Sequence, residues 1–203
     1  MLFRSNALVS LGGLPPSRQT ADAIVAAWPS LKDRWLESAA VGAAASDPLL
    51  YLQAAFESKD PAFVVGYVPH LARLAAQQAD GDRAARFVAL VAGASAKADP
   101  LKQAALDSFA ANLKSGVKPA SGTALVAGLK TLLGSERTAG SALPLVARWD
   151  ADNQLAASVK PAVERAEKQL TDASLGDGVR GQIAVNLIGV RAVDPSIVPA
   201  VSP

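Results

Sequence analysis

Residues 176–181 read Gly-Asp-Gly-Val-Arg-Gly and match the G-x-G-x-x-G fingerprint of dinucleotide-binding proteins. In those proteins the glycines follow a strand, let the main chain approach a pyrophosphate, and precede an acidic residue about 20 positions on. Here residues 169–175 have the pattern of a helix end, and the sequence stops too soon for the acidic residue. The sequence therefore favours a glycine turn between two helices.

A second motif could supply a nucleophile. Residues 115–118 read Ser-Gly-Val-Lys, the S-x-x-K spacing of the serine and lysine in penicillin-recognising enzymes. Those enzymes also need a Lys-Thr-Gly motif, but here Lys130 and Thr131 are followed by Leu132. The tetrad also lies in a stretch rich in glycine and proline, residues 115–122. We interpret it as part of a loop and assign no catalytic residue.

Metal ligands are scarce in this chain. It has one histidine, His70, and no cysteine, which excludes a histidine triad, thiolate metal sites, iron–sulfur clusters and c-type haem attachment. Residues 150–153, Asp-Ala-Asp-Asn, begin like a calcium loop, but Leu155 replaces the required glycine and Pro161 the required glutamate. We therefore predict no metal and no cofactor, a helix cap at residues 150–153 and a partly buried structural role for His70.

The charges exclude a nucleic-acid partner. Twenty basic residues face 18 acidic ones, a net charge of +2 that offers no basic stripe for a phosphate backbone. One stretch is a candidate partner surface: Lys160, Arg165 and Lys168 recur at helical spacing. Glu164 and Glu167 lie among them, so the pattern favours a solvated helix face with i,i+4 ion pairs.

Composition indicates an all-α protein. Half of the residues are hydrophobic but only 5% are aromatic, so alanine, leucine and valine must fill the interior. Small side chains of this kind suit closely stacked helices, and no alternating apolar and polar run is long enough for a strand. The three tryptophans, Trp28, Trp35 and Trp149, could mark a binding surface, but in an aromatic-poor chain we expect them to fill gaps between helices.

Helix-start signals divide the chain into about ten helices. Ser17 should cap a helix over 18–27, and Ser30 or Asp33 the next one. Further starts are an aspartate followed by proline, a cap with proline in the first turn; they stand at 47–48, 60–61 and 99–100. Later helices are expected over 123–133, 136–149, 153–173 and after Gly176. An apolar face at 2–11 predicts that the chain opens inside a helix.

Two of these helices carry a specific expectation. The one that starts at 60–61 should break near Val68, because Pro69 cannot donate a helical hydrogen bond. The helix after Asp33 should bury a stripe that begins with Trp35 and Leu36 and continues through alanines.

The helix heads recur with a repeat period. An acidic residue and an arginine stand at four of them: Asp33 and Arg34, Asp82 and Arg83, Glu136 and Arg137, and Asp177 and Arg180. The arginines are 49, 54 and 43 residues apart, close to the roughly 40–47 of HEAT repeats. The pattern predicts one domain over 1–203, a right-handed α-α superhelix of stacked antiparallel helix pairs with a local irregularity at 115–122.

The acid–arginine heads have two interpretations. They could line a concave face as a charged ladder for a partner. Alternatively, each acid caps its helix while the arginine reaches an acid or a carbonyl of the neighbouring repeat. We favour the structural interpretation.

At these residues the chain resembles HEAT-repeat sequences, in which an aspartate and an arginine open the second helix of each hairpin. Residues 8–15 and 33–39 also look like the HEAT segment of large bacterial multidomain dehydrogenases, which join a glucose/sorbosone dehydrogenase-like propeller, a helical segment and a cytochrome c domain. That resemblance implies a spacer in the periplasm or cell envelope; otherwise the expected location is cytoplasmic. It carries over no catalytic or haem residue, because this chain has no C-x-x-C-H motif.

The sequence thus predicts a non-catalytic helical-repeat scaffold or protein-interaction module. Its partners would be another protein or neighbouring domains of the same chain. The unfinished cap-and-proline start at 194–195 suggests a segment of a longer protein, and no stretch approaches the ~20 apolar residues of a membrane span. The alternative is a free-standing helical ligand-binding protein or enzyme with a site in a concave groove.

Overall fold

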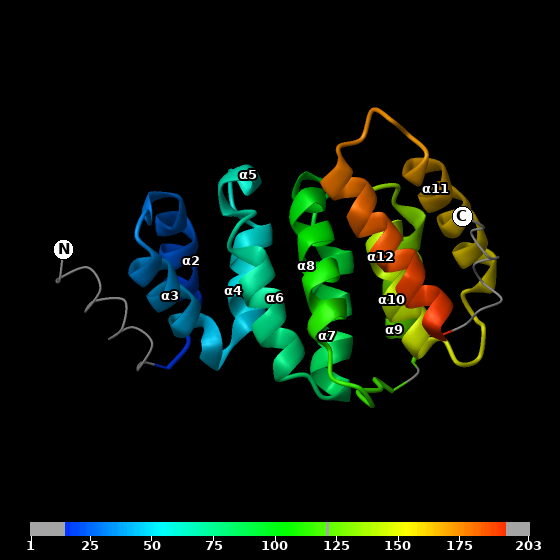
Figure 1. The fold of residues 1–203 in the computed structure, drawn as a ribbon. Coiled ribbons are helices and arrows are strands. Elements are labelled where there is room, and N and C mark those ends of the chain that lie inside the picture. Colours follow the sequence, from blue (N-terminus) through cyan, green and yellow to red (C-terminus); the bar gives the residue numbers. More distant parts are fainter. Residues whose placement is uncertain (1–14, 121, 194–203) are drawn as a thin grey trace. The chain divides into compact units, whose positions relative to one another are not determined.

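The protein is all-α, as its composition predicted. The computed structural model describes residues 15–120 and 122–193, which form eleven α-helices, three short 3-10 helices and no strand (Figure 1). The apolar segment at 2–11 and the helix start at 194–195 lie outside the described residues. No helix in the described ranges is long and apolar enough to cross a membrane.

The helices gather into two compact units. Unit 1 is made of Met1–Ala79 and Gly93–Ser115, and unit 2 of Asp80–Ala92 and Gly116–Pro203, each taken over its described residues. The last of the three boundaries between them, after Ser115, falls in the irregular stretch expected at 115–122. Each unit is described by itself below.

Unit 1 contains helices whose starts the sequence signals well. Its elements are α2 (Arg18–Ala27), η1 (Trp28–Ser30), α3 (Arg34–Ala43), η2 (Ala44–Ser46), α4 (Pro48–Phe56), α5 (Pro61–Val64), α6 (Val68–Gln77), η3 (Ala96–Ala98) and α8 (Asp99–Asn112). Ser17 caps α2 by accepting the Thr20 amide at 3.1 Å, and Asp33 caps α3 by accepting the Trp35 amide at 2.8 Å. Local capping chemistry therefore fixes where these two helices begin.

The three aspartate–proline starts differ in what the carboxylate does. Asp47 caps α4 through the Leu50 amide at 3.3 Å. Asp60 precedes α5 but makes no capping hydrogen bond, and Asp99 instead forms an ion pair with Lys102 at 3.0 Å. The predicted helix starts are confirmed at all three places, but the predicted side-chain cap is wrong at Asp60 and Asp99, because the proline alone preorganises the first turn.

The break expected before Pro69 is present. α5 ends at Val64 and α6 begins at Val68, with a turn between them. Within unit 1, α2 packs on α4, α4 on α6 and α6 on α8, while α5 lies against η1 and α8 (Figure 1). Its largest fully buried side chains include three aromatic rings, those of Tyr51, Tyr67 and Phe109.

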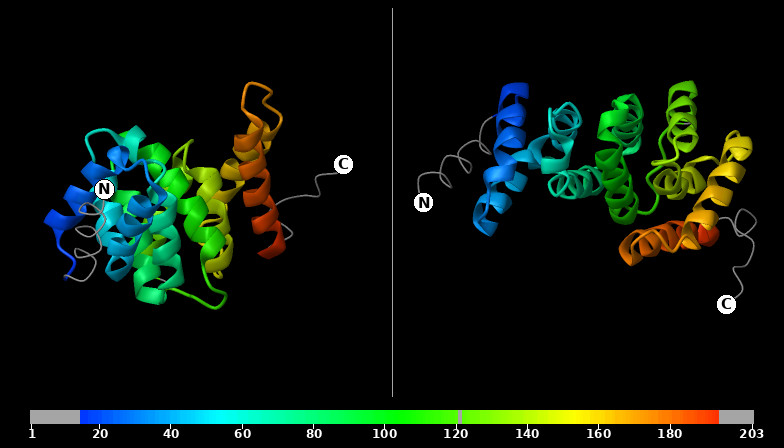
Figure 2. Two further views of the ribbon diagram at one scale, coloured as in Figure 1. Left: turned by 60° about the vertical axis from the view of Figure 1, so that its left-hand side comes forward. Right: turned by 90° about the horizontal axis from the view of Figure 1, so that it is seen from above.

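Unit 2 is built from longer helices, and its interior is mostly aliphatic with the buried rings of Phe87 and Trp149. It contains most of α7 (Gly81–Gly93), together with α9 (Thr123–Gly134), α10 (Ala139–Trp149), α11 (Ala156–Leu170) and α12 (Asp177–Val193). α10 packs against α9, α11 and α12 (Figures 1 and 2). Close approach requires glycine at two places: a Cβ on Gly81 would lie 2.8 Å from the Lys118 carbonyl oxygen, and one on Gly128 would lie 2.9 Å from Val88 Cγ1.

The four acid–arginine heads occupy different positions. Asp33 caps α3 and Arg34 is its first residue, but α7 is capped by Asp80, whose carboxylate accepts the Arg83 amide at 2.8 Å, while Asp82 lies in the first turn. Glu136 and Arg137 are exposed in the turn before α10. Asp177 and Arg180 form an ion pair with each other within the first turn of α12.

Long-range ties are made by other side chains. Five donors reach main-chain carbonyls 27 to 39 residues earlier in the chain: Tyr67 to Ala40, Gln78 to Ala45, Ser108 to Pro69, Trp149 to Val117 and Arg165 to Leu133. Four of these ties join two helical segments of one unit, and the tie from Trp149 joins α10 to the helix-free stretch that contains Val117.

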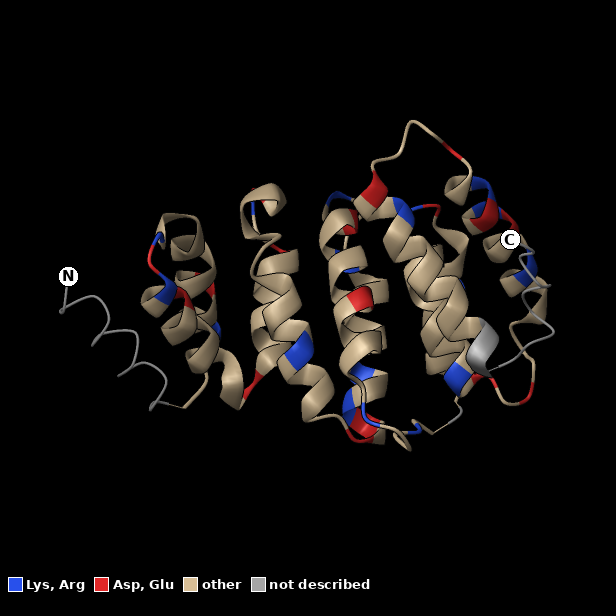
Figure 3. Ribbon diagram, in the orientation of Figure 1, with Lys and Arg blue, Asp and Glu red and all other residues tan. Residues whose placement is uncertain are grey.

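Three surface expectations are wrong. Trp35 is 79% exposed instead of opening a buried stripe, and His70 is exposed instead of partly buried. On α11, which carries both charge signs (Figure 3), no ion pair engages Lys160, Glu164 or Lys168 in the described structure. Helical spacing predicts which residues share a face, but it cannot predict whether a neighbour covers that face or whether flexible side chains pair.

Candidate functional site

An open groove of about 490 Å³ lies in unit 1 and is the candidate site. Its apolar lining comes from Val25, Ala26, Pro29, Ala54 and Val64, together with the ring of Phe63. A volume of this size is in the range of ligand pockets, and an apolar lining with a few polar groups is typical of binding clefts.

Three elements shape the groove. The last turn of α2 and the proline of η1 form one side, and the last turn of α4 forms another. The turn 57–60 then leads into α5, which supplies Phe63 and Val64. Because the two residues before Pro61 cannot continue α4 into one long helix, the chain turns here and leaves the end of α4 open.

An arginine bridges two of the carboxylates around the groove. Arg18 Nε lies 2.8 Å from Asp22 and its Nη2 lies 2.7 Å from Glu57, so one guanidinium joins α2 to the end of α4. The hydrogen bond from Arg18, and a second one from Gln53, hold the pKa of Glu57 below its ordinary value. All three side chains are well exposed, so this network contributes little stability, and it leaves Asp22 and Glu57 already occupied.

Asp60 and Phe63 are the groove residues without such a role. Asp60 is exposed, and its carboxylate has no hydrogen bond or ion pair in the described structure. Phe63 is 65% exposed although it lies beside an apolar lining. A free carboxylate and an uncovered aromatic ring, three residues apart on a helical turn, are available to a partner.

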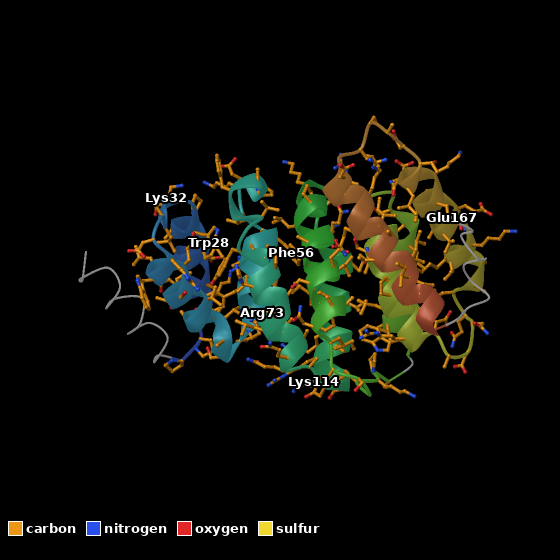
Figure 4. The ribbon with its side chains drawn as sticks, in the orientation of Figure 1. Trp28, Lys32, Phe56, Arg73, Lys114 and Glu167 are labelled. Carbon is orange, nitrogen blue, oxygen red and sulfur yellow. The ribbon has the colours of Figure 1, made fainter. Side chains whose placement is uncertain are left out.

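A rigid aromatic cluster lies next to the groove. The Trp28 ring (Figure 4) stacks on the Tyr67 ring, with the two centroids 4.2 Å apart. The His70 ring is tilted relative to Trp28, and its centroid lies 6.4 Å from the Trp28 centroid. Tyr67 is fully buried and donates to the Ala40 carbonyl at 2.8 Å; burial raises the pKa of its phenol. The cluster holds the segment after α2 in place, and so fixes the position of Pro29 in the groove lining.

The motifs with apparent chemistry lie elsewhere. Residues 176–181 form the turn and first turn that open α12, with no strand before them in the described residues. The 115–118 tetrad is in the helix-free stretch, where the Val117 carbonyl accepts the Trp149 indole at 3.0 Å. The Asp150 carboxylate accepts the amides of Gln154 and Leu155, both at 2.8 Å, in the turn between α10 and α11; the predicted helix cap at 150–153 is wrong, because α11 begins later and has no side-chain cap.

Titratable side chains do not assemble into a reactive constellation. Across residues 15–120 and 122–193, no three histidine, aspartate or glutamate side chains are placed to hold a metal ion. His70 contacts an aromatic ring and belongs to no acid–base pair that the structure describes. The groove offers apolar contact and charge, and its one hydroxyl, that of Ser58, makes no hydrogen bond to a base in the described residues.

Comparison adds no relative to this geometry. No family model, no curated protein and no solved structure matches the chain.

The sequence contained one overlooked signal for this site. Asp60, Pro61 and Phe63 were visible as a helix start with an aromatic residue in its first turn. What the pattern did not reveal is that α5 stops after a single turn and that the Phe63 side chain stays 65% exposed. A proline at 69, eight positions after Pro61, was the available hint that the helix would be short.

Proposed function

We propose that this chain is a non-catalytic helical-repeat module of HEAT type that binds another protein, and that the groove of unit 1 is a docking surface. The observation that carries the proposal is the exposed Phe63 ring at an open apolar groove. Aromatic anchors in pockets supply most of the energy of protein interfaces, and an uncovered ring beside apolar walls is the usual form of such an anchor before binding.

Two further observations support a binding role over catalysis. The groove contains no histidine, and two of its carboxylates are engaged by one arginine. The long-range ties to carbonyls hold helices of successive layers together, which suits a framework that presents a surface.

A peptide selection with a matched pair of variants tests the proposal. Twelve-residue peptides are selected from a random display library on the intact chain, and the strongest binder is titrated against Phe63→Ala and Trp35→Ala. Both rings are exposed, but only Phe63 lines the groove. We expect Phe63→Ala to weaken binding about tenfold, and Trp35→Ala to change it less than about twofold.

Two results would contradict docking at the groove. One is that no peptide is selected on the intact chain. The other is that the selected peptide binds Phe63→Ala as tightly as the unchanged chain.

The resemblance to the HEAT segment of multidomain dehydrogenases supports a narrower form of this proposal, in which the chain is the spacer of such a protein. In that form of the proposal, the module holds a propeller and a cytochrome c domain of the same polypeptide. Reading the gene on both sides of this segment tests it: a propeller upstream and a C-x-x-C-H motif downstream are expected, and their absence would rule out the spacer.

A further inference from the structure

The charge around the groove is unevenly satisfied. Asp22 and Glu57 share Arg18, whereas the adjacent Asp60 and Lys59 are exposed and make no ion pair in the described structure. The charged side chains around the groove are therefore three acids and two bases. Lys59 is a long, flexible side chain that can point into water, while the short Asp60 carboxylate stays close to the main chain at the groove.

Helix ends add negative potential at the same place. α4 ends at Phe56, and the groove is lined by its last turn, through Ala54 and the following Glu57. α2 also contributes its last turn, Val25 and Ala26. The C-terminal end of a helix carries a partial negative charge from carbonyls without intrahelical partners, which favours a nearby cation.

Asp60 and Phe63 together select one cation over others. Asp60 precedes α5 and Phe63 lies in its single turn, and both residues line the groove, so one cation in the groove can reach both. A guanidinium can donate two parallel hydrogen bonds to a carboxylate and also stack on an aromatic face. A lysine ammonium pairs less well with a carboxylate, because it is a compact and strongly hydrated charge.

We propose that the groove binds an arginine side chain flanked by apolar residues, in a segment of a partner protein. The guanidinium pairs with Asp60 and stacks on Phe63, while a neighbouring aliphatic side chain occupies the lining formed by Val25, Ala54 and Val64. This inference rests on the proposed docking function and adds the chemistry of the partner.

Three defined peptides test the inference. They share the sequence Ser-Gly-Ala-Leu-X-Leu-Ala-Gly-Ser, with arginine, glutamine or glutamate at X, and are titrated into the isotopically labelled intact chain while amide shifts are followed by NMR. We expect the arginine peptide to bind about tenfold tighter than the glutamine peptide, the combined effect of an exposed ion pair and a cation–π contact. The glutamate peptide should bind weakest, and the shifts should map to Val25, Ala26 and Val64.

Two isosteric variants separate the local charge from net charge. Asp60→Asn should reduce the arginine preference to about twofold, because the cation–π contact remains. Glu164→Gln, which removes an exposed acid of unit 2 that also lacks an ion pair, should leave the preference unchanged. Asp60 makes no capping hydrogen bond, so its variant should fold like the unchanged chain.

The outcomes distinguish this inference from docking itself. If arginine and glutamine peptides bind equally, and both lose affinity in Phe63→Ala, the groove docks peptides but the arginine preference is wrong. If the glutamate peptide binds best, Lys59 dominates and the inference is overturned. If the arginine peptide does not bind at all, the inference also fails, while a peptide selected from the random library can still support docking.

Discussion

The two units satisfy the exposed end of a helix in different ways. In unit 1 the last turns of α3 and η2 receive neutral donors, the Tyr67 phenol on the Ala40 carbonyl and the Gln78 amide on the Ala45 carbonyl. In unit 2 the end of α9 receives the Thr138 hydroxyl at the Leu132 carbonyl and the Arg165 guanidinium at the Leu133 carbonyl, both at 2.7 Å. Of these carbonyl donors, the one from Arg165 in unit 2 is charged, whereas both donors in unit 1 are neutral.

The number of buried aromatic rings also differs between the units. Unit 1 fully buries the rings of Tyr51, Tyr67 and Phe109 among isoleucine and leucine side chains, whereas the largest fully buried side chains of unit 2 are one ring and three leucines: Phe87, Leu129, Leu132 and Leu133. In unit 1 the Tyr67 ring also stacks on Trp28, which precedes Pro29 of the groove lining. We infer from this difference that the groove of unit 1 depends on the stacked pair.

Removing the central ring of unit 1 should have the largest effect. Tyr67→Ala removes the stack on Trp28 and leaves a cavity, so we expect the free energy of unfolding to fall by about 4 kcal/mol. Tyr67→Phe keeps the ring and loses only the bond to Ala40, with an expected loss of about 1 kcal/mol. Urea unfolding measures both, and equal losses would show that packing is not the main contribution.

The charged tie of unit 2 should have an intermediate effect. Arg165→Met keeps much of the aliphatic stem but removes the donor to the Leu133 carbonyl, so we expect a loss of about 1.5 kcal/mol. Hydrogen exchange should show faster exchange in α9 and α11 while α4 and α6 are unaffected. Uniformly faster exchange in both units would contradict the assignment of this tie to unit 2.

Two aspartates of unit 1 sharpen the distinction between structural and available groups. Asp47→Ala removes a cap and should cost about 1 kcal/mol, whereas Asp60→Ala removes no hydrogen bond and should cost less than about 0.3 kcal/mol. Thermal unfolding of the two variants provides the measurement. A comparable loss in both would mean that Asp60 supports α5 and is not free for a partner.

The smallest expected effect is a pH dependence of unit 1. Because the folded-state pKa of Glu57 is lowered, its contribution is present above its ordinary pKa of 4.5 and is lost as the pH falls through the lower folded value. Because the ion pair is exposed, the loss amounts to about 0.3 kcal/mol, and it sets in as the pH falls below the ordinary pKa of 4.5. In urea unfolding, the Glu57→Gln variant should lose this pH-dependent part of the free energy of unfolding. A pH dependence equal to that of the unchanged chain would show that Arg18 does not stabilise the charged form of Glu57.

Local signals predicted the helices well. Ser17, Asp33 and Asp47 were correctly predicted as caps, and the break before Pro69 followed from the missing amide of proline. These signals act within one turn of the chain, so the sequence contains everything needed to interpret them. For the same reason the sequence could not predict that Arg165, in the middle of α11, would bond to a carbonyl 32 residues earlier.

The candidate site was predictable only in its parts. The sequence indicated a helix start at Asp60 and an aromatic residue at 63, but it gave no reason to expect the ring to be exposed, and it placed Trp35 in the interior. Helical spacing groups residues on a face, and burial of that face requires a second element to lie on it.

The sequence by itself determined that this protein is all-α, where most of its helices begin, and that it lacks cysteine and a second histidine. These follow from composition and from contacts within a turn. Only the tertiary structure decided which aromatic rings are buried, which carbonyls receive a distant donor, and that Asp60 and Phe63 stand uncovered at a groove. The physical reason is that coverage and long-range pairing depend on residues tens of positions apart, which no local pattern brings together.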